Sequence, residues 1–164
     1  GPIGLGTALS ARLSGAEIHV TDLSPTRLDI ARTRFGFERG IVSGDLLRDS
    51  SEGGFDTVFD ATGNGSSMNA AFSLVGHGGS LVFVSVVKDT ICFADADFHA
   101  REMTVIGSRN ALKADFQAVM AAIRDARIDT SALCSEVLTL EGAETQLPRL
   151  AADRESLIKA LVVP

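Results

Sequence analysis

A glycine-rich turn at the start of the chain and a carboxylate some twenty residues later have the types and spacing to do chemistry. The chain opens Gly1-Pro2-Ile3-Gly4-Leu5-Gly6, and glycine, which has no Cβ, lets a backbone come close to a bulky anion. The small apolar residues that follow predict a helix, whose N-terminus favours a negative charge. Residues 17–21 then predict a strand leading into Asp22. This order and spacing are typical of a turn that binds the pyrophosphate of a dinucleotide, while the acid accepts hydrogen bonds from a ribose.

The pattern is incomplete at its N-terminal side. It ordinarily runs strand, G-x-G-x-x-G, helix, and here Gly1 and Gly4 fit the second and third glycines. We therefore expect the chain to be part of a longer polypeptide, although Gly1-Pro2 could instead remain from an expression tag. In the usual topology the missing strand is central, so its neighbours would lose backbone partners, at about 1–3 kcal/mol for each buried group.

Composition limits the class of protein. A length of 164 residues is that of one ordinary domain. The net charge of −6 and the pI near 5.0 argue against a nucleic-acid partner, and no apolar run approaches the ~18 residues that span a membrane. No signal peptide is visible, and Cys92 and Cys134 fit neither a zinc nor a redox spacing. We expect a reducing, cytoplasmic location and no membrane partner.

The rest of the chain alternates helices with strands. Ser24 is the expected N-cap of a helix that begins at Pro25 and ends before Gly36. Further helices are expected over residues 3–13, 66–75 and 114–127, and strands over 17–21, 41–42, 55–62, 80–87 and 104–107, with a polar loop over 45–54 and a turn over 76–79. The order predicts an α/β fold with a doubly wound parallel Rossmann sheet that lacks its first strand.

A tail from residue 111 to residue 164 exceeds what a nucleotide-binding half needs. It begins with a strongly amphipathic helix, and we expect the apolar residues from Phe116 to Ile123 to pack in the core. A strand over 133–138, a helix from Thr139 and a strand over 157–163 follow. Pro148 is expected to kink or split that last helix.

Five motifs in a consistent order carry a family resemblance. They are Gly1-Pro2-Ile3-Gly4, Val20-Thr21-Asp22-Leu23-Ser24-Pro25-x-Arg27-Leu28-x-x-Ala31, Phe59-Asp60-Ala61-Thr62-Gly63-Asn64, Gly78-Gly79-x-Leu81-Val82-x-Val84 and Ile106-Gly107-Ser108-Arg109-Asn110. Together they resemble the medium-chain dehydrogenase/reductase family, the zinc-type alcohol and polyol dehydrogenases. The resemblance implies an N-terminally truncated NAD-binding domain over 1–110 and a segment over 111–164 that returns to the catalytic domain.

The resemblance also implies a set of cofactor-binding residues. The glycine turn would line the pyrophosphate, Asp22 would hold the adenosine ribose, the turn after residue 60 would border the adenine and ribose side, and the two later segments would approach the nicotinamide. The set is Gly1, Pro2, Ile3, Gly4, Asp22, Leu23, Arg27, Ala61, Thr62, Gly63, Val84, Ser85, Val86, Ser108, Arg109 and Asn110.

The function implied is hydride transfer between a secondary alcohol and NAD in a zinc-dependent alcohol, polyol or sugar-acid dehydrogenase. NAD is favoured over NADP because the charge of Asp22 would repel a 2′-phosphate. The family's zinc ligands precede the cofactor domain, so we expect neither catalytic residues nor a metal in this chain, and no activity from it alone. The resemblance further implies a homo-oligomer, a dimer or a tetramer, with a small alcohol or sugar as substrate.

Several alternatives stay open. A zinc-free quinone or enoyl reductase of the same family, or a non-catalytic nucleotide-sensing module, would also bind a dinucleotide. The short-chain dehydrogenases are set aside, because they need a Tyr-x-x-x-Lys pair and this chain has no tyrosine. Asp60, at the end of an apolar strand, is expected to bond a loop rather than to act as a catalyst. His19, His77 and His99 have no metal-binding spacing, and Asp22 could instead be a plain turn residue.

Overall fold

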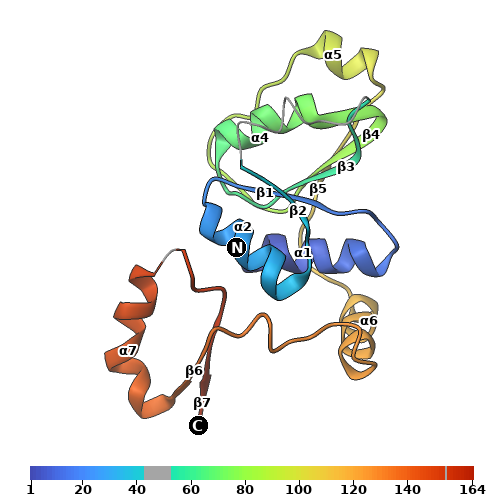
Figure 1. The fold of residues 1–164 in the computed structure, drawn as a ribbon. Helices are drawn as coiled ribbons and strands as arrows, with labels where there is room; N and C mark the ends of the chain where they lie inside the picture. The colour runs from blue at the N-terminus through green and yellow to red at the C-terminus, as the bar shows by residue number, and fades with distance from the viewer. Residues whose placement is uncertain (43–52, 154) are drawn as a thin grey trace. The chain divides into compact units, whose positions relative to one another are not determined.

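The structure, a computed structural model, describes residues 1–42, 53–153 and 155–164 (Figure 1). Its internal contacts divide the chain into two compact units. The first unit is Ser43–Asn110 with Gly1 and Ile3, and the second is Gly4–Val42 and Ala111–Pro164 with Pro2. The fold is α/β, and every strand pair in the described residues is parallel.

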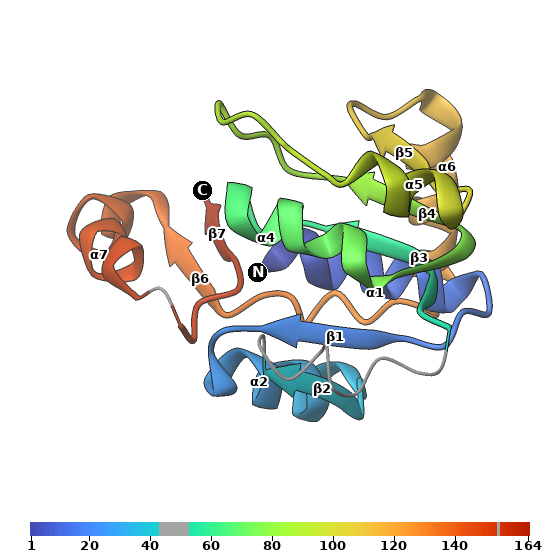
Figure 2. The ribbon, with the colours of Figure 1, turned by 90° about the horizontal axis from the view of Figure 1, so that it is seen from above.

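The first unit is built around a three-stranded sheet in the order β3–β4–β5. Its elements are β3 (Phe55–Asp60), α4 (Gly65–Ala71), the 3-10 turn η1 (Phe72–Leu74), β4 (Val75–Phe83), α5 (Asp95–Ala100) and β5 (Thr104–Gly107). Helix α4 packs against β3 and β4 (Figure 2). In the core of the first unit, Val75 and Leu81 are fully buried, with Phe72 and Met103 in the same cluster.

The second unit begins with α1 (Pro2–Leu13), β1 (His19–Asp22), α2 (Pro25–Phe35) and β2 (Arg39–Val42). Strands β1 and β2 pair in register, Asp22 opposite Val42. As predicted, Ser24 caps α2, accepting a hydrogen bond from the Arg27 N–H, and Gly36 ends it at φ +66°. Within each unit, neighbouring strands follow the chain order, β1–β2 in one and β3–β4–β5 in the other, as successive strands do in each half of a doubly wound sheet.

The second unit continues with α6 (Lys113–Arg124), β6 (Glu136–Thr139), α7 (Leu140–Ala152) and β7 (Ala160–Val163), of which β6 and β7 pair. Its core joins early and late parts of the chain: Leu9, Ala31, Phe35 and Phe37 pack in one cluster with Ala122, Ile128 and Ile158. The Arg12 guanidinium adds a bond to the Phe35 carbonyl and lies 4.8 Å from the Phe37 ring centre.

Three sequence expectations are wrong in detail. The glycines at 76–79 do not turn the chain but lie inside β4, which begins at Val75 and pairs with Phe55 before a register shift. Gly76 permits this because a Cβ there would stand 2.6 Å from the Gly53 carbonyl oxygen. The split that Pro148 could have caused does not occur, because α7 continues through this residue from Leu140 to Ala152.

The third correction concerns α6. Its apolar face is exposed rather than packed in the core: Phe116 is 64% and Met120 67% exposed. The buried residue of this helix is Ala122, so a small side chain makes its contact with the core. The expected polar loop over 45–54 lies largely outside the described residues.

Candidate functional site

The carboxyl ends of three strands meet at one edge of the first unit's sheet. Asp60 at the end of β3 pairs with Phe83 at the end of β4, and Phe83 pairs with Gly107 at the end of β5. The three segments predicted to bind a cofactor, 61–63, 84–86 and 108–110, therefore all leave the sheet at this edge. In open parallel sheets this is the edge where ligands bind.

Asp60 is buried at that edge, with 4% of its surface exposed. Its Oδ1 accepts hydrogen bonds from the Thr62 N–H (3.0 Å) and hydroxyl (2.9 Å), and lies 3.3 Å from the Ser85 hydroxyl. Its Oδ2 accepts from the Ser67 hydroxyl at 2.9 Å. None of the ion pairs found among the described residues includes Asp60, so donors from three hydroxyl residues surround this carboxylate.

The main chain of Asp60 also ends the strand pairing. Its carbonyl oxygen accepts from both the Val84 N–H (2.9 Å) and the Ser85 N–H (3.3 Å). The strands consequently stop at Asp60 and Phe83, earlier than the predicted ends at 62 and 87. Asp60 bonds a loop, as predicted, and does so through both its side chain and its backbone.

The turn after β3 is open toward solvent at Gly63. This residue has φ +65°, and a Cβ there would meet no heavy atom within 4 Å. Its N–H donates to the Ser85 hydroxyl at 2.9 Å. Two segments predicted to contact a cofactor, from β3 and from β4, are thus joined by one hydrogen bond. The space in front of Gly63 suits the close approach of a flat or charged ligand group.

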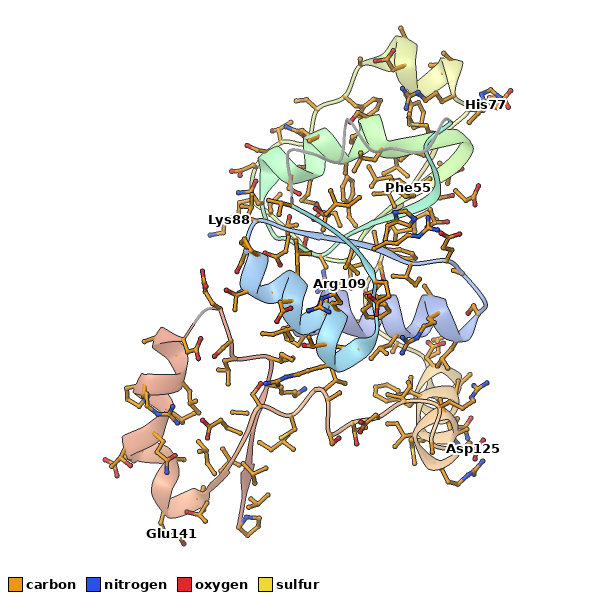
Figure 3. All side chains as sticks on the ribbon, viewed as in Figure 1. Phe55, His77, Lys88, Arg109, Asp125 and Glu141 are labelled. Carbon is orange, nitrogen blue, oxygen red and sulfur yellow. The ribbon has the colours of Figure 1, made fainter. Side chains whose placement is uncertain are left out.

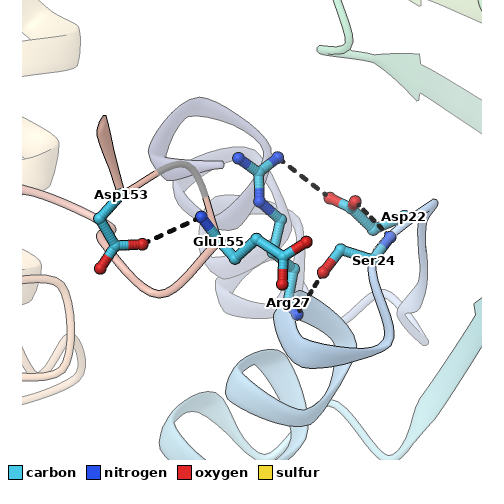
Figure 4. Close-up of polar contacts among 5 residues, drawn as sticks. All are labelled: Asp22, Ser24, Arg27, Asp153 and Glu155. Atoms are coloured by element: carbon cyan, nitrogen blue, oxygen red, sulfur yellow. Dashed lines mark hydrogen bonds and ion pairs between the residues drawn. The ribbon is translucent and has the colours of Figure 1, made fainter. Parts of the chain in front are cut away.

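A second carboxylate ends β1 in the other unit (Figure 4). Asp22 Oδ1 accepts from the Ser24 N–H at 3.0 Å, while Oδ2 lies 3.7 Å from an Arg27 guanidinium nitrogen. The structure thus brings together Asp22 and Arg27, which the sequence had paired at one ribose. Figure 4 also draws Asp153 of the C-terminal tail, whose Oδ1 accepts the Glu155 N–H at 3.1 Å.

The remaining predicted residues are mostly at the surface. Helix α1 begins at Pro2, so Gly1 directly precedes it and Gly4 lies in its first turn, where backbone N–H groups have no helical acceptor. Leu23 and Val86 are 80% and 84% exposed. Arg109 (Figure 3), Ser108 and Asn110 are exposed as well, and the Ser108 N–H is held by the Phe83 carbonyl at 2.9 Å.

Sequence reasoning missed Ser67, whose hydroxyl completes the Asp60 cluster, and the role of Ser24 as a donor to Asp22. One signal for part of this was present. Asp22-Leu23-Ser24 and Asp60-Ala61-Thr62 share the pattern Asp-x-Ser/Thr, in which the carboxylate accepts the N–H two residues on. No such local pattern links Ser67 to Asp60.

A zinc site does not fit the described residues. Among them, no group of three or more histidine, cysteine, aspartate or glutamate side chains is placed to hold a metal ion. Cys92 is exposed and Cys134 half-buried, and both are free thiols.

In the described ranges, no helix combines the length and apolarity needed to cross a bilayer.

Comparisons with known proteins place this geometry in context. The sequence profile described as "Zinc-binding dehydrogenase" matches residues 2–125. L-galactonate-5-dehydrogenase from Escherichia coli K12 is 33% identical over 175 residues, covering 99% of this chain and 49% of that protein. The chain spans about half the length of the curated relatives that it matches.

Solved structures share the fold. A zinc-binding dehydrogenase from Sinorhizobium meliloti 1021, bound to NADP, has a TM-score of 0.86 at 22% identity, covering 100% of this chain and 50% of that one. A protein described as a short chain alcohol dehydrogenase from E. coli CFT073, complexed with NADH, has a TM-score of 0.89 at 16% identity, with the same coverage. Because both cofactors occur on this fold, the choice between them depends on individual side chains.

Proposed function

Because the chain belongs to the zinc-binding dehydrogenase family, within the zinc-type medium-chain dehydrogenases, we propose that it is the NAD-binding part of a dehydrogenase that oxidises a secondary alcohol of a polyol or sugar acid. Bound NAD would accept the hydride. The observation that carries the proposal is the alignment of three strand ends at one sheet edge, with open space at Gly63. The relatives' names support the substrate class, since one is a galactonate dehydrogenase and others are D-xylulose reductases.

In this proposal each predicted segment has one task. Gly1, Pro2, Ile3 and Gly4 would lie against the pyrophosphate, and Asp22, with Leu23 and Arg27 beside it, would hold the adenosine ribose. Ala61, Thr62 and Gly63 would border the adenine and ribose side. Val84, Ser85, Val86, Ser108, Arg109 and Asn110 would approach the nicotinamide. The substrate and any catalytic metal would be held by residues outside this chain's described part.

Asp22 supports NAD over NADP. Its Oδ1 accepts the Ser24 N–H, whereas the contact found for its Oδ2 among the described residues is an Arg27 guanidinium nitrogen at 3.7 Å. That distance is too long for a hydrogen bond. This oxygen can therefore accept a ribose hydroxyl, and a carboxylate hydrogen bond of this kind contributes about 1.5–3 kcal/mol. A 2′-phosphate at the same place would be repelled by the carboxylate.

The test is a titration of the chain with NADH and NADPH, followed by the cofactor's own fluorescence. The absence of tryptophan and tyrosine leaves the nicotinamide emission free of protein background. We expect NADH to bind at least tenfold more tightly than NADPH. Failure of the unmodified chain to bind either cofactor would contradict the proposed function.

Asp22→Arg sharpens the assignment. We expect it to weaken NADH binding by about 10- to 100-fold, from the loss of roughly 1.5–3 kcal/mol, and to shift the preference toward NADPH. Asp29→Arg, an exposed position on α2, controls for the added positive charge and should leave the ratio of the two affinities nearly unchanged. Equal affinities before and after Asp22→Arg would remove Asp22 from the ribose site.

A further inference from the structure

We propose that Asp60 is a positioning residue for the dinucleotide: without touching it, the buried carboxylate fixes Thr62, Gly63 and Ser85 in the arrangement that receives it. The inference rests on the proposed function. Asp60 is 4% exposed, whereas Thr62 and Gly63 are exposed and Ser85 is half-buried. The groups that can meet a ligand are therefore those that Asp60 holds, and not Asp60 itself.

The carboxylate of Asp60 orients the hydroxyl groups that donate hydrogen bonds to it. A hydroxyl has one hydrogen to donate and lone pairs to accept with. Because the Ser85 oxygen accepts the Gly63 N–H at 2.9 Å, its hydrogen is available to Asp60 Oδ1, 3.3 Å away. The chain of bonds thus runs from Gly63 through Ser85 to Asp60.

Thr62 forms a second chain of the same kind. Its hydroxyl donates to Asp60 Oδ1 at 2.9 Å and accepts the Asn64 N–H at 3.2 Å. Asn64 in turn caps α4, accepting the Ser67 N–H at 3.0 Å. Both series of hydrogen bonds end in a hydroxyl, of Thr62 or of Ser85, that donates to Asp60 Oδ1. The residue at position 60 must therefore offer an acceptor for both hydroxyl hydrogens. An acceptor-only carboxylate does this with two oxygens.

Burial of a carboxylate without a cation is costly, which indicates that Asp60 serves more than packing. Asp56, four residues earlier in β3, is exposed. It is the matched control for a lost charge on this strand. Ser67 is the matched control for a lost Asp60 bond, because its hydroxyl contacts Asp60 but neither Gly63 nor Ser85.

The experiment compares four variants of the chain: Asp60→Asn, Ser85→Ala, Ser67→Ala and Asp56→Asn. Amide hydrogen exchange of Thr62 and Gly63 is measured without ligand. The Kd for NADH is then measured well below each variant's melting temperature. A merely structural role would lower the melting temperature but leave the Kd of the folded protein unchanged.

We expect Asp60→Asn to speed exchange at Thr62 and Gly63 and to raise the Kd about tenfold, which corresponds to roughly 1.4 kcal/mol. Ser85→Ala, which is milder and should fold even if Asp60→Asn does not, is expected to speed exchange at Gly63 and raise the Kd several-fold. Ser67→Ala should lower the melting temperature and leave the Kd within twofold. Asp56→Asn should change neither.

Two outcomes would overturn the inference while leaving the proposed function intact. One is NADH binding by the unmodified chain with an unchanged Kd in both Asp60→Asn and Ser85→Ala. The other is an equal rise in Kd for Ser67→Ala, since loss of any bond to Asp60 would then act through stability alone. No NADH binding by the unmodified chain would instead contradict the proposed function, and the inference with it.

Discussion

The same local turn ends β1 in one unit and β3 in the other, but the two aspartates that build it have different surroundings. In both, Oδ1 accepts the N–H two residues later at 3.0 Å. The second oxygen of Asp22 lies beside Arg27, and the Asp22 side chain is partly exposed to solvent. That of Asp60 is buried and accepts from the Ser67 and Thr62 hydroxyls at 2.9 and 3.2 Å.

This difference separates two uses of one motif. A carboxylate with an accessible oxygen can bind a ligand, whereas one whose oxygens are both used by the protein can only hold its neighbours in place. Asp22 therefore suits the first use and Asp60 the second. The contrast predicts opposite responses: substitution of Asp22 should affect ligand choice more than stability, and substitution of Asp60 should affect both.

The largest effect expected from this contrast is on unfolding. Asp60→Asn replaces an acceptor oxygen by an NH₂ group facing hydroxyl donors, and buried unsatisfied groups cost about 1–3 kcal/mol each. Asp22→Asn keeps an oxygen for the Ser24 N–H and loses only a long, partly exposed ion pair, worth about 0–1 kcal/mol. We expect Asp60→Asn to lower the free energy of unfolding by about 1–3 kcal/mol more than Asp22→Asn.

Urea unfolding measures this difference, and amide exchange of Leu81 and Val20 reports each unit separately. The two aspartates lie in different units, so one global transition cannot be assumed. Equal losses for both variants would contradict the division of roles. A larger loss for Asp22→Asn would reverse it.

A smaller effect is expected from the glycine that follows the buried aspartate. Gly63→Ala places a side chain at φ +65°, and an L-residue there costs about 1–2 kcal/mol. Gly78→Ala is the matched control, because Gly78 has φ +70° and its Cβ would likewise meet nothing within 4 Å. Both should lose similar stability, but only Gly63→Ala should weaken NADH binding, since its Cβ would fill the space offered to the ligand.

Parallel titrations with NADH check this pair. Equal affinities for Gly63→Ala and the unmodified chain would show that the space in front of Gly63 is not used by the cofactor. Equal weakening in both variants would show that strain in the first unit, rather than the added methyl group, affects binding.

The local parts of this comparison could be predicted from sequence patterns. The Asp22 motif, the caps at Ser24 and Gly36, and the alternation of helices and strands all depend on residues close together in the chain. What could not be predicted depends on distant partners. The sequence gives Asp22 and Asp60 the same local motif, and only the packing of β3 against β4 brings Ser85 to the second one.

The errors have the same origin. A run of glycines predicts a turn. Here Gly76 and Gly79 lie in β4 instead, where the backbone of residues 53–55 comes so close that a Cβ at either position would collide with it. The amphipathic pattern of α6 correctly predicts a helix, yet it cannot say which face meets the core, and the small residue Ala122 makes that contact. Close approach and the choice of packing partner are properties of the fold, not of a local window.

The smallest expected effect comes from another turn in which an aspartate accepts the N–H two residues later, at Asp153. Its Oδ1 accepts the Glu155 and Ser156 N–H groups at 3.1 and 2.8 Å, and its Oδ2 accepts the Ser156 hydroxyl. The Ser156 hydroxyl, followed by the Ser156 N–H, lowers the pKa of Asp153 from its ordinary 3.8 to about 2. A depressed pKa in the folded state stabilises the fold above pH 3.8, and this contribution is lost as the pH falls toward 2.

Because this carboxylate is near the surface and screened by solvent, we expect only a slight stability advantage of the unmodified chain over Asp153→Asn at pH 6, vanishing near pH 2. Carboxyl NMR titration is the sharper measurement: Ser156→Ala should move the Asp153 midpoint back toward 3.8. Asp129, whose pKa is lowered chiefly by the Ser131 hydroxyl, should not move in that variant. An unchanged Asp153 midpoint would mean that backbone N–H groups alone suffice, and the hydroxyls around Asp60 would then lose much of their assigned importance.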